Sequence, residues 1–261
     1  MRYAPGEQIE GMVKLNANEN PYPPSPKVIK SVHGGFSGIR LYPDYTYSSL
    51  KKAFCSAYNL GTEQVIVGNG SDEILDLFSR YFSGKIAYPA PSFIMFGIYA
   101  KINGEPVQIG LEKDFSLDPK KVISKKPDFV FIASPNNPTG NQIPIGVIKE
   151  ICEGSEGTVL VDEAYADFSE SNCLSLLKRY DNLVISRTLS KSYSLAGMRV
   201  GFGIGNKGII ERIEDTRPPF NLSILSTIAG ESALGDQAYM KKNVEKIKKE
   251  KPSAVLLDVL M

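Results

Sequence analysis

Short apolar segments alternate with amphipathic segments along most of this chain, and this alternation constrains its fold more than any other feature. Strands are predicted at 65–68, 86–88, 128–134, 158–162, 183–186 and 200–205. Helices are predicted at 71–82, where apolar residues recur at helical spacing, from about 92 onward, and at 236–251. Strands separated by helices indicate an α/β fold with a mostly parallel sheet. Such sheets bind ligands at the carboxyl ends of their strands.

The two ends of the sequence depart from this alternation. Four prolines between positions 21 and 26 predict an extended arm and loop over the first thirty residues. Six Lys and two Glu within 241–251 predict a solvated helix face rather than a nucleic-acid surface. Pro252 is predicted to end that helix. The following SAVLLDVL is predicted to begin an apolar element that has few neighbouring segments to pack against.

Composition excludes several classes of function. Thirty Lys and Arg balance 29 Asp and Glu, and the resulting net charge of +1 argues against a dedicated nucleic-acid binder. Three Cys without a C-x-x-C pair, together with the single His33, lead us to expect neither a disulfide framework nor a metal site. No apolar run is long enough to cross a bilayer, and the N-terminus lacks the apolar region of a signal peptide. We therefore expect a cytoplasmic protein without membrane partners.

Four polar clusters follow predicted strands, and the first is GNGSDE at 68–73. Its glycines allow a tight turn into a helix, whose free N–H groups and positive dipole end suit a phosphate near Ser71 and Asp72. Taken alone, this string is better interpreted as a plain capped turn. It is not a dinucleotide-binding fingerprint, because Glu73 stands where the third glycine should be.

The second and third clusters place polar side chains after two buried strands. SPNNPTG at 134–140 forms a rigid turn, from which Asn137 could donate a hydrogen bond to a ligand oxygen. Asp162 ends the strand at 158–162, where a carboxylate is costly unless it caps a helix, pairs or meets a cation. A protonated ring nitrogen of a ligand would meet that need, and Tyr165 could direct its phenol at the same ligand.

The fourth cluster is SRTLSKSYSLAGMR at 186–199. A lysine in an enclosed site loses its proton readily and can form a Schiff base, which is the role that Lys191 could have. Thr188, Ser190 and Arg199 supply donors for a phosphate dianion. A single loop lysine is usually just solvated, so this interpretation depends on all four clusters together. One ligand explains them all: pyridoxal 5′-phosphate.

At this point the sequence resembles the fold-type-I pyridoxal-phosphate aminotransferases, and within them the histidinol-phosphate aminotransferase branch. The matching motifs, in order, are KLNANENPYPPSP, LYPD, GNGSDEIL, SPNNPTG, VDEAY, RTLSKSYSLAGMRVGF and RPPFN. The resemblance implies a mostly parallel central sheet with helices on both faces and an incomplete small domain. It divides the chain into an arm with part of the small domain (1–35), a large cofactor-binding domain (36–235) and the start of a truncated small domain (236–261).

The resemblance also implies roles for matching positions. Lys191 would hold the cofactor covalently and shuttle a proton, while Asp162 would keep the ring nitrogen protonated. Asn137 and Tyr165 would hydrogen-bond the ring oxygen. The cofactor phosphate would be bound by the backbone of Ser71 and Asp72 and by Thr188, Ser190 and Arg199.

Three further residues come from the same resemblance. Phe93 would stack on the cofactor ring, although a simple core role is the alternative. Tyr42 would reach the phosphate of the neighbouring subunit, which makes the active unit a homodimer; a turn-packing role is its alternative. Asn20 would belong to an N-terminal lid over the substrate.

The sequence departs from the family pattern in one respect, and several functions stay open. No Arg follows Arg217, so no position inherits the arginine that clamps the substrate carboxylate in the family. The expected function is amino transfer between histidinol phosphate and 2-oxoglutarate. Threonine-phosphate decarboxylase, an aromatic aminotransferase, a truncated cofactor-binding protein without activity, and a nicotinamide-dependent enzyme are the alternatives.

Overall fold

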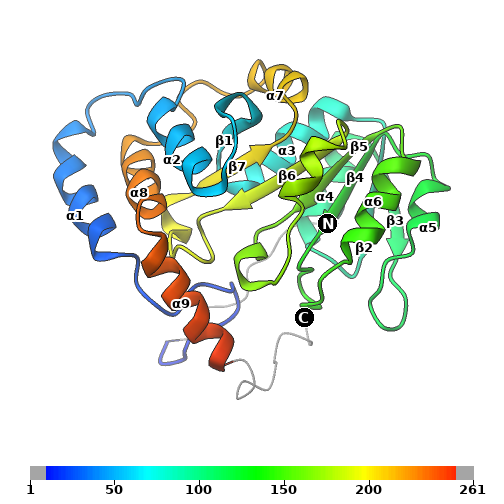
Figure 1. Ribbon diagram of the computed structural model, residues 1–261, viewed down its shortest axis with the longest axis horizontal. Coiled ribbons are helices and arrows are strands. Elements are labelled where there is room, and N and C mark those ends of the chain that lie inside the picture. Colours follow the sequence, from blue (N-terminus) through cyan, green and yellow to red (C-terminus); the bar gives the residue numbers. More distant parts are fainter. Residues whose placement is uncertain (1–9, 251–261) are drawn as a thin grey trace.

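The computed structural model describes residues 10–250 and shows a central sheet flanked by helices (Figure 1). Within these residues seven strands pair in the order β1-β7-β6-β5-β4-β2-β3. Their bounds are β1 (Val65–Asn69), β2 (Lys85–Ala90), β3 (Glu105–Gly110), β4 (Phe129–Ala133), β5 (Thr158–Asp162), β6 (Leu183–Thr188) and β7 (Val200–Ile204). Neighbouring strands are parallel except at β7, which is antiparallel to both β1 and β6. The predicted α/β class with a mostly parallel sheet is confirmed.

Helices cover both faces of this sheet. Their bounds are α1 (Pro26–Gly35), α2 (Ser48–Tyr58), α3 (Gly70–Phe82), α4 (Ile94–Asn103), α5 (Pro119–Ile123), α6 (Ile145–Gly154), α7 (Lys207–Glu214), α8 (Ile224–Leu234) and α9 (Gln237–Glu250). Successive strand residues point to opposite faces. Val65 and Val67 of β1 therefore join a core with α2, α6 and α8, whereas Ile66 joins a second core with α3, α4 and α7. Among residues 10–250, no helix is both long and apolar enough to cross a membrane.

The predicted strands and helices within the described residues are present, but the predicted arm extends too far, and the sequence did not individually predict β3, α2, α5, α6, α7 and α8. The predicted arm is wrong at its end, because α1 already begins at Pro26, where Ser25 caps the helix and the proline occupies its first turn. Strand β3 was missed because it is a largely exposed edge strand that contains Pro106, a residue tolerated at an edge. Helix α9 matches its prediction, whereas SAVLLDVL lies outside the described residues. The predicted domain boundaries stay predictions.

Candidate functional site

A cleft of about 920 Å³ opens at the edge of the sheet where β2, β4, β5 and β6 end. The last residues of these four strands, Ala90, Ala133, Asp162 and Thr188, all line it. The cleft also collects every residue predicted for the site except Tyr42 and Asn20. These residues are Ser71, Asp72, Phe93, Asn137, Asp162, Tyr165, Thr188, Ser190, Lys191 and Arg199.

Asp162 lies at the carboxyl end of β5 and is only 6% exposed. From the neighbouring strand, Ser186 Oγ donates a hydrogen bond of 2.6 Å to Asp162 Oδ1. Burial nevertheless raises the pKa of Asp162 to about 6. Among the ion pairs of residues 10–250, none involves this carboxylate. A cationic group of a ligand would therefore stabilise its ionised form.

Lys191 follows β6 and directs its amine toward the N-terminal segment. Its Nζ donates to the carbonyl oxygens of Ala17 at 3.0 Å and Asn18 at 3.2 Å, and lies 5.5 Å from the ring centroid of Tyr165. Burial lowers the pKa of Lys191, although the negative charge of Asp72 opposes this effect. A lowered pKa increases the share of neutral amine, which is the nucleophilic form.

The turn between β1 and α3 forms one end of the cleft. Gly70 has a φ of +75°, and a Cβ there would meet the Arg199 guanidinium. An alanine at this position would therefore be strained and would displace the guanidinium from the start of the helix. Gly70 N donates to Arg199 O at 2.8 Å, and Arg199 Nη2 pairs with Asp72 Oδ2 at 2.8 Å. The guanidinium and the first-turn N–H groups of α3 together offer donors that suit a phosphate.

Two hydroxyl groups line the same cleft. Thr188 Oγ1 donates to Ser190 Oγ at 2.9 Å and accepts a hydrogen bond of 3.1 Å from Ser190 N. These bonds fix the backbone at the end of β6 and hold both hydroxyls together. A hydroxyl pair can donate to an anion without adding charge, so it complements the arginine.

The two asparagines after β4 have different surroundings. Asn136 is buried, and its Nδ2 donates to Pro91 O at 3.1 Å and to Thr139 Oγ1 at 2.7 Å. Asn137 lines the cleft. The residue predicted to contact a ligand is thus the one that the structure leaves facing the cleft, and its neighbour fixes the turn.

Two aromatic side chains complete the walls. Tyr165 OH accepts a hydrogen bond of 3.0 Å from Asn18 Nδ2. Phe93 precedes α4, lines the cleft and packs edge-on against Phe96 with 5.7 Å between ring centroids. The two interpretations of Phe93 are therefore compatible, because its ring touches the core and the cleft.

Asn20 and Tyr42 do not line this cleft. Asn20 Nδ2 donates to Lys191 O at 2.8 Å and to Ser192 O at 3.3 Å, which ties the N-terminal segment to the lysine loop. Tyr42 is 77% exposed and stacks on Phe220, with 4.5 Å between ring centroids. Its predicted role in a neighbouring subunit requires a second copy of the chain.

A buried ion pair behind the cleft was not predicted. Arg187 Nη2 lies 2.7 Å from Glu163 Oε2, and the two side chains are 6% and 1% exposed. The strands β5 and β6 pair Asp162 with Ser186, so the residues that follow each of them come together. The signal was present in the sequence, as two charged residues directly after two predicted strands.

The residues present fit pyridoxal 5′-phosphate. A buried carboxylate suits its cationic ring nitrogen, an amine of lowered pKa suits its aldehyde, and the turn at Gly70 leaves Arg199 beside a helix N-terminus for its phosphate. All three groups belong to one cleft.

Comparisons with known proteins agree with this fit. The family model for aminotransferase class I and II matches residues 10–255. A histidinol-phosphate aminotransferase from Rippkaea orientalis is 39% identical over 245 residues, which cover 92% of this chain and 70% of that protein.

Solved structures show the same fold. The crystal structure of the histidinol-phosphate aminotransferase from Clostridium acetobutylicum has 30% sequence identity and a TM-score of 0.85, and the match covers 91% of this chain and 74% of that one. The enzyme from Sinorhizobium meliloti, in complex with pyridoxal-5′-phosphate, gives a TM-score of 0.84 at 23% identity, with 90% and 68% covered. The fold implied by the sequence motifs is confirmed.

Proposed function

Because the chain belongs to the class I and II aminotransferase family, we propose that it transfers an amino group between histidinol phosphate and 2-oxoglutarate, with pyridoxal 5′-phosphate as cofactor. One observation carries the proposal: the Lys191 amine, the Asp162 carboxylate and the turn at Ser71 and Asp72 share one cleft. The likeness to histidinol-phosphate aminotransferases supports the choice of substrate.

Pyridoxal phosphate, when bound, supplies a ring that withdraws electrons from the substrate. Asp162 would keep the ring nitrogen protonated, since a buried carboxylate gains stability from a nearby cation. Asn137 and Tyr165 would hydrogen-bond the ring oxygen, and Phe93 would cover one ring face. The phosphate would be held by Ser71, Asp72, Thr188, Ser190 and Arg199.

Lys191 would act twice. Its amine would bind the cofactor covalently, and it would then move the proton between the substrate Cα and the cofactor C4′. Both tasks need a neutral amine near neutral pH, and burial lowers the pKa of Lys191 in that direction. Asn20 holds the backbone of this lysine, and the N-terminal segment that carries Asn20 would cover the substrate.

The active unit would be a homodimer in which Tyr42 reaches the phosphate of the second subunit. The exposed tyrosine lies among other exposed apolar side chains of the same segment and of the 217–222 turn. These are Ile39, Leu41, Tyr45 and Phe220. An exposed apolar surface of this kind suits burial against a second copy. Cys55, Cys152 and Cys173 are all free thiols, which supports the proposed cytoplasmic location.

The purified protein with pyridoxal phosphate tests the proposal spectroscopically. Histidinol phosphate should convert the absorbance of the bound aldehyde form into that of the amine form, and 2-oxoglutarate should reverse the change. Release of CO₂ from threonine phosphate without amino transfer would show that the protein is a decarboxylase instead. A cofactor spectrum that no amino donor changes would contradict the transferase activity. Lys191→Ala is the control and should lack the absorbance of the covalently bound cofactor.

A further inference from the structure

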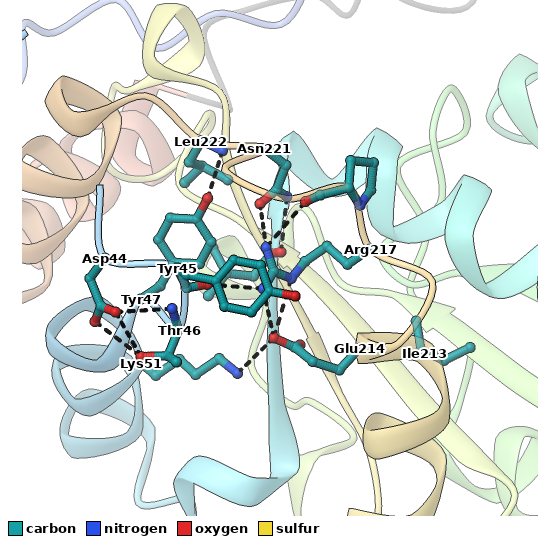
Figure 2. A network of polar contacts seen from close by, with 12 residues as sticks. Asp44, Tyr45, Thr46, Tyr47, Lys51, Ile213, Glu214, Arg217, Asn221 and Leu222 are labelled. Carbon is teal, nitrogen blue, oxygen red and sulfur yellow. Dashed lines mark hydrogen bonds and ion pairs between the residues drawn. The ribbon is translucent and has the colours of Figure 1, made fainter. Parts of the chain in front are cut away.

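Arg217 is a buried hub in the turn that connects α7 to α8 (Figure 2), and its side chain is 0% exposed. Its guanidinium donates to Glu214 Oε1 at 2.9 Å, to Asn221 Oδ1 at 2.8 Å and to Tyr45 O at 3.1 Å. It also lies 5.1 Å from the ring centroids of both Tyr45 and Tyr47. The guanidinium of Arg217, the last arginine of the sequence, is thus bonded within the protein, and Arg217 does not line the cleft.

Asn221 extends this network to the end of β1. Arg217 fixes its Oδ1, so its Nδ2 points to the other side, where it donates to Glu73 Oε2 at 2.5 Å and to Val67 O at 3.2 Å. Asn69 Nδ2 donates back to Asn221 O at 2.9 Å, and Asn69 N donates to the same Glu73 oxygen at 2.6 Å. One amide side chain therefore holds both the last residues of β1 and the first turn of α3.

That first turn is the end of the cleft where the proposed function places the cofactor phosphate. Ser71 and Asp72 line the cleft, and Gly70 N donates to Arg199 O. The N–H groups of a helix start can bind an anion only where their directions converge. Arg199, next to β7, bonds this turn on one side, and Asn221, in the turn that connects α7 to α8, bonds it on the other.

The same hub also holds the segment that carries Tyr42. Arg217 donates to the backbone of Tyr45, and Phe220 stacks on Tyr42. The turn 217–222 is therefore in contact with both elements that would bind phosphate, one in this chain's cleft and one directed at a second subunit.

We propose that Asn221, oriented by Arg217, is a positioning residue for phosphate binding at the N-terminus of α3. This inference rests on the proposed function, because it takes the cofactor phosphate as the anion. Asn221 itself does not line the cleft, so it acts through Glu73 and the backbone of β1.

Two ligands separate this role from a general loss of structure. Asn221→Ala should raise the Kd for pyridoxal phosphate about tenfold, equal to about 1.4 kcal/mol, and leave the Kd for pyridoxal unchanged, because pyridoxal lacks the phosphate. Asn221→Asp keeps the acceptor for Arg217 but places an oxygen against Glu73, so it should weaken pyridoxal phosphate binding at least as much. Both Kd values are measured by absorbance titration, with thermal melting of each variant.

Asn103→Ala is the matched control. Asn103 Nδ2 also holds α3, through Asp76 Oδ1 at 3.0 Å and Ser79 Oγ at 2.8 Å, but away from the first turn. It should lower the melting temperature without changing the Kd for pyridoxal phosphate. Unchanged pyridoxal phosphate binding in both Asn221 variants, or an equal loss for pyridoxal, would overturn the inference. Wild-type protein that binds neither compound would overturn the proposed function, and the inference with it.

Discussion

Ser186 on β6 donates a hydrogen bond of 2.6 Å to Asp162 on β5, and this bond does not compensate the carboxylate for its burial. The pKa of Asp162 is still raised to about 6, mainly by desolvation. Between about pH 4 and pH 6 the folded protein thus holds this proton more tightly than the unfolded chain. Above that range the buried charge destabilises the cofactor-free protein. The same charge can pair with a cationic group of a ligand.

Asp162→Asn should therefore stabilise the cofactor-free protein at pH 8. The expected gain is about 1–3 kcal/mol in the free energy of unfolding. It should shrink toward pH 5, where this carboxyl is already mostly protonated in the folded wild-type protein. Urea denaturation at both pH values measures the difference. The same variant should bind pyridoxal phosphate more weakly. A variant less stable than wild type at pH 8 would show that the carboxylate has a structural role instead.

Gly70→Ala should weaken pyridoxal phosphate binding at least about tenfold, because the added Cβ meets the Arg199 guanidinium at the helix start. Gly11→Ala provides a control for backbone strain alone. Gly11 has a similar φ of +82°, and nothing lies within 4 Å of an added Cβ. This control should cost stability, by about 1 kcal/mol, and leave the Kd unchanged. Equal Kd values for the two variants would refute the role of the turn.

The buried Arg187–Glu163 pair should matter for stability. Arg187→Met leaves the Glu163 carboxylate buried without its partner, and should lower the free energy of unfolding by about 3–5 kcal/mol. Adding Glu163→Met in the same chain should recover part of this loss, because the second charge is then removed as well. Urea denaturation of the two variants tests this order; a double variant less stable than Arg187→Met would contradict it.

Subunit mixing tests the role of Tyr42. Tyr42→Ala and Lys191→Ala should each impair amino transfer, but a mixed dimer contains one site with both original side chains. Equal mixing after mild denaturation should restore about a quarter of the wild-type sites, since half of the dimers are mixed. Activity no greater than the mean of the two separate variants would show that Tyr42 does not serve a second subunit.

The sequence predicted the sheet well because most strands are buried on both faces and form short continuous apolar segments. It could not reveal β3, where exposure and Pro106 remove that signal. The cleft was predictable because its residues follow strands whose ends meet at one edge. Hydrogen-bond partners such as Ser186 and Asn221 could not be predicted. The local sequence around a serine or asparagine is the same whether or not the folded chain brings a distant carboxylate next to it.

Borohydride reduction of the protein loaded with pyridoxal phosphate, followed by peptide mapping, tests the central claim most directly. Lys191 faces the cleft with a lowered pKa, so the stable adduct should form on the peptide that contains it, and Lys191→Ala should abolish the adduct. An adduct on a different lysine, or none at all in wild-type protein that has bound the cofactor, would contradict the account.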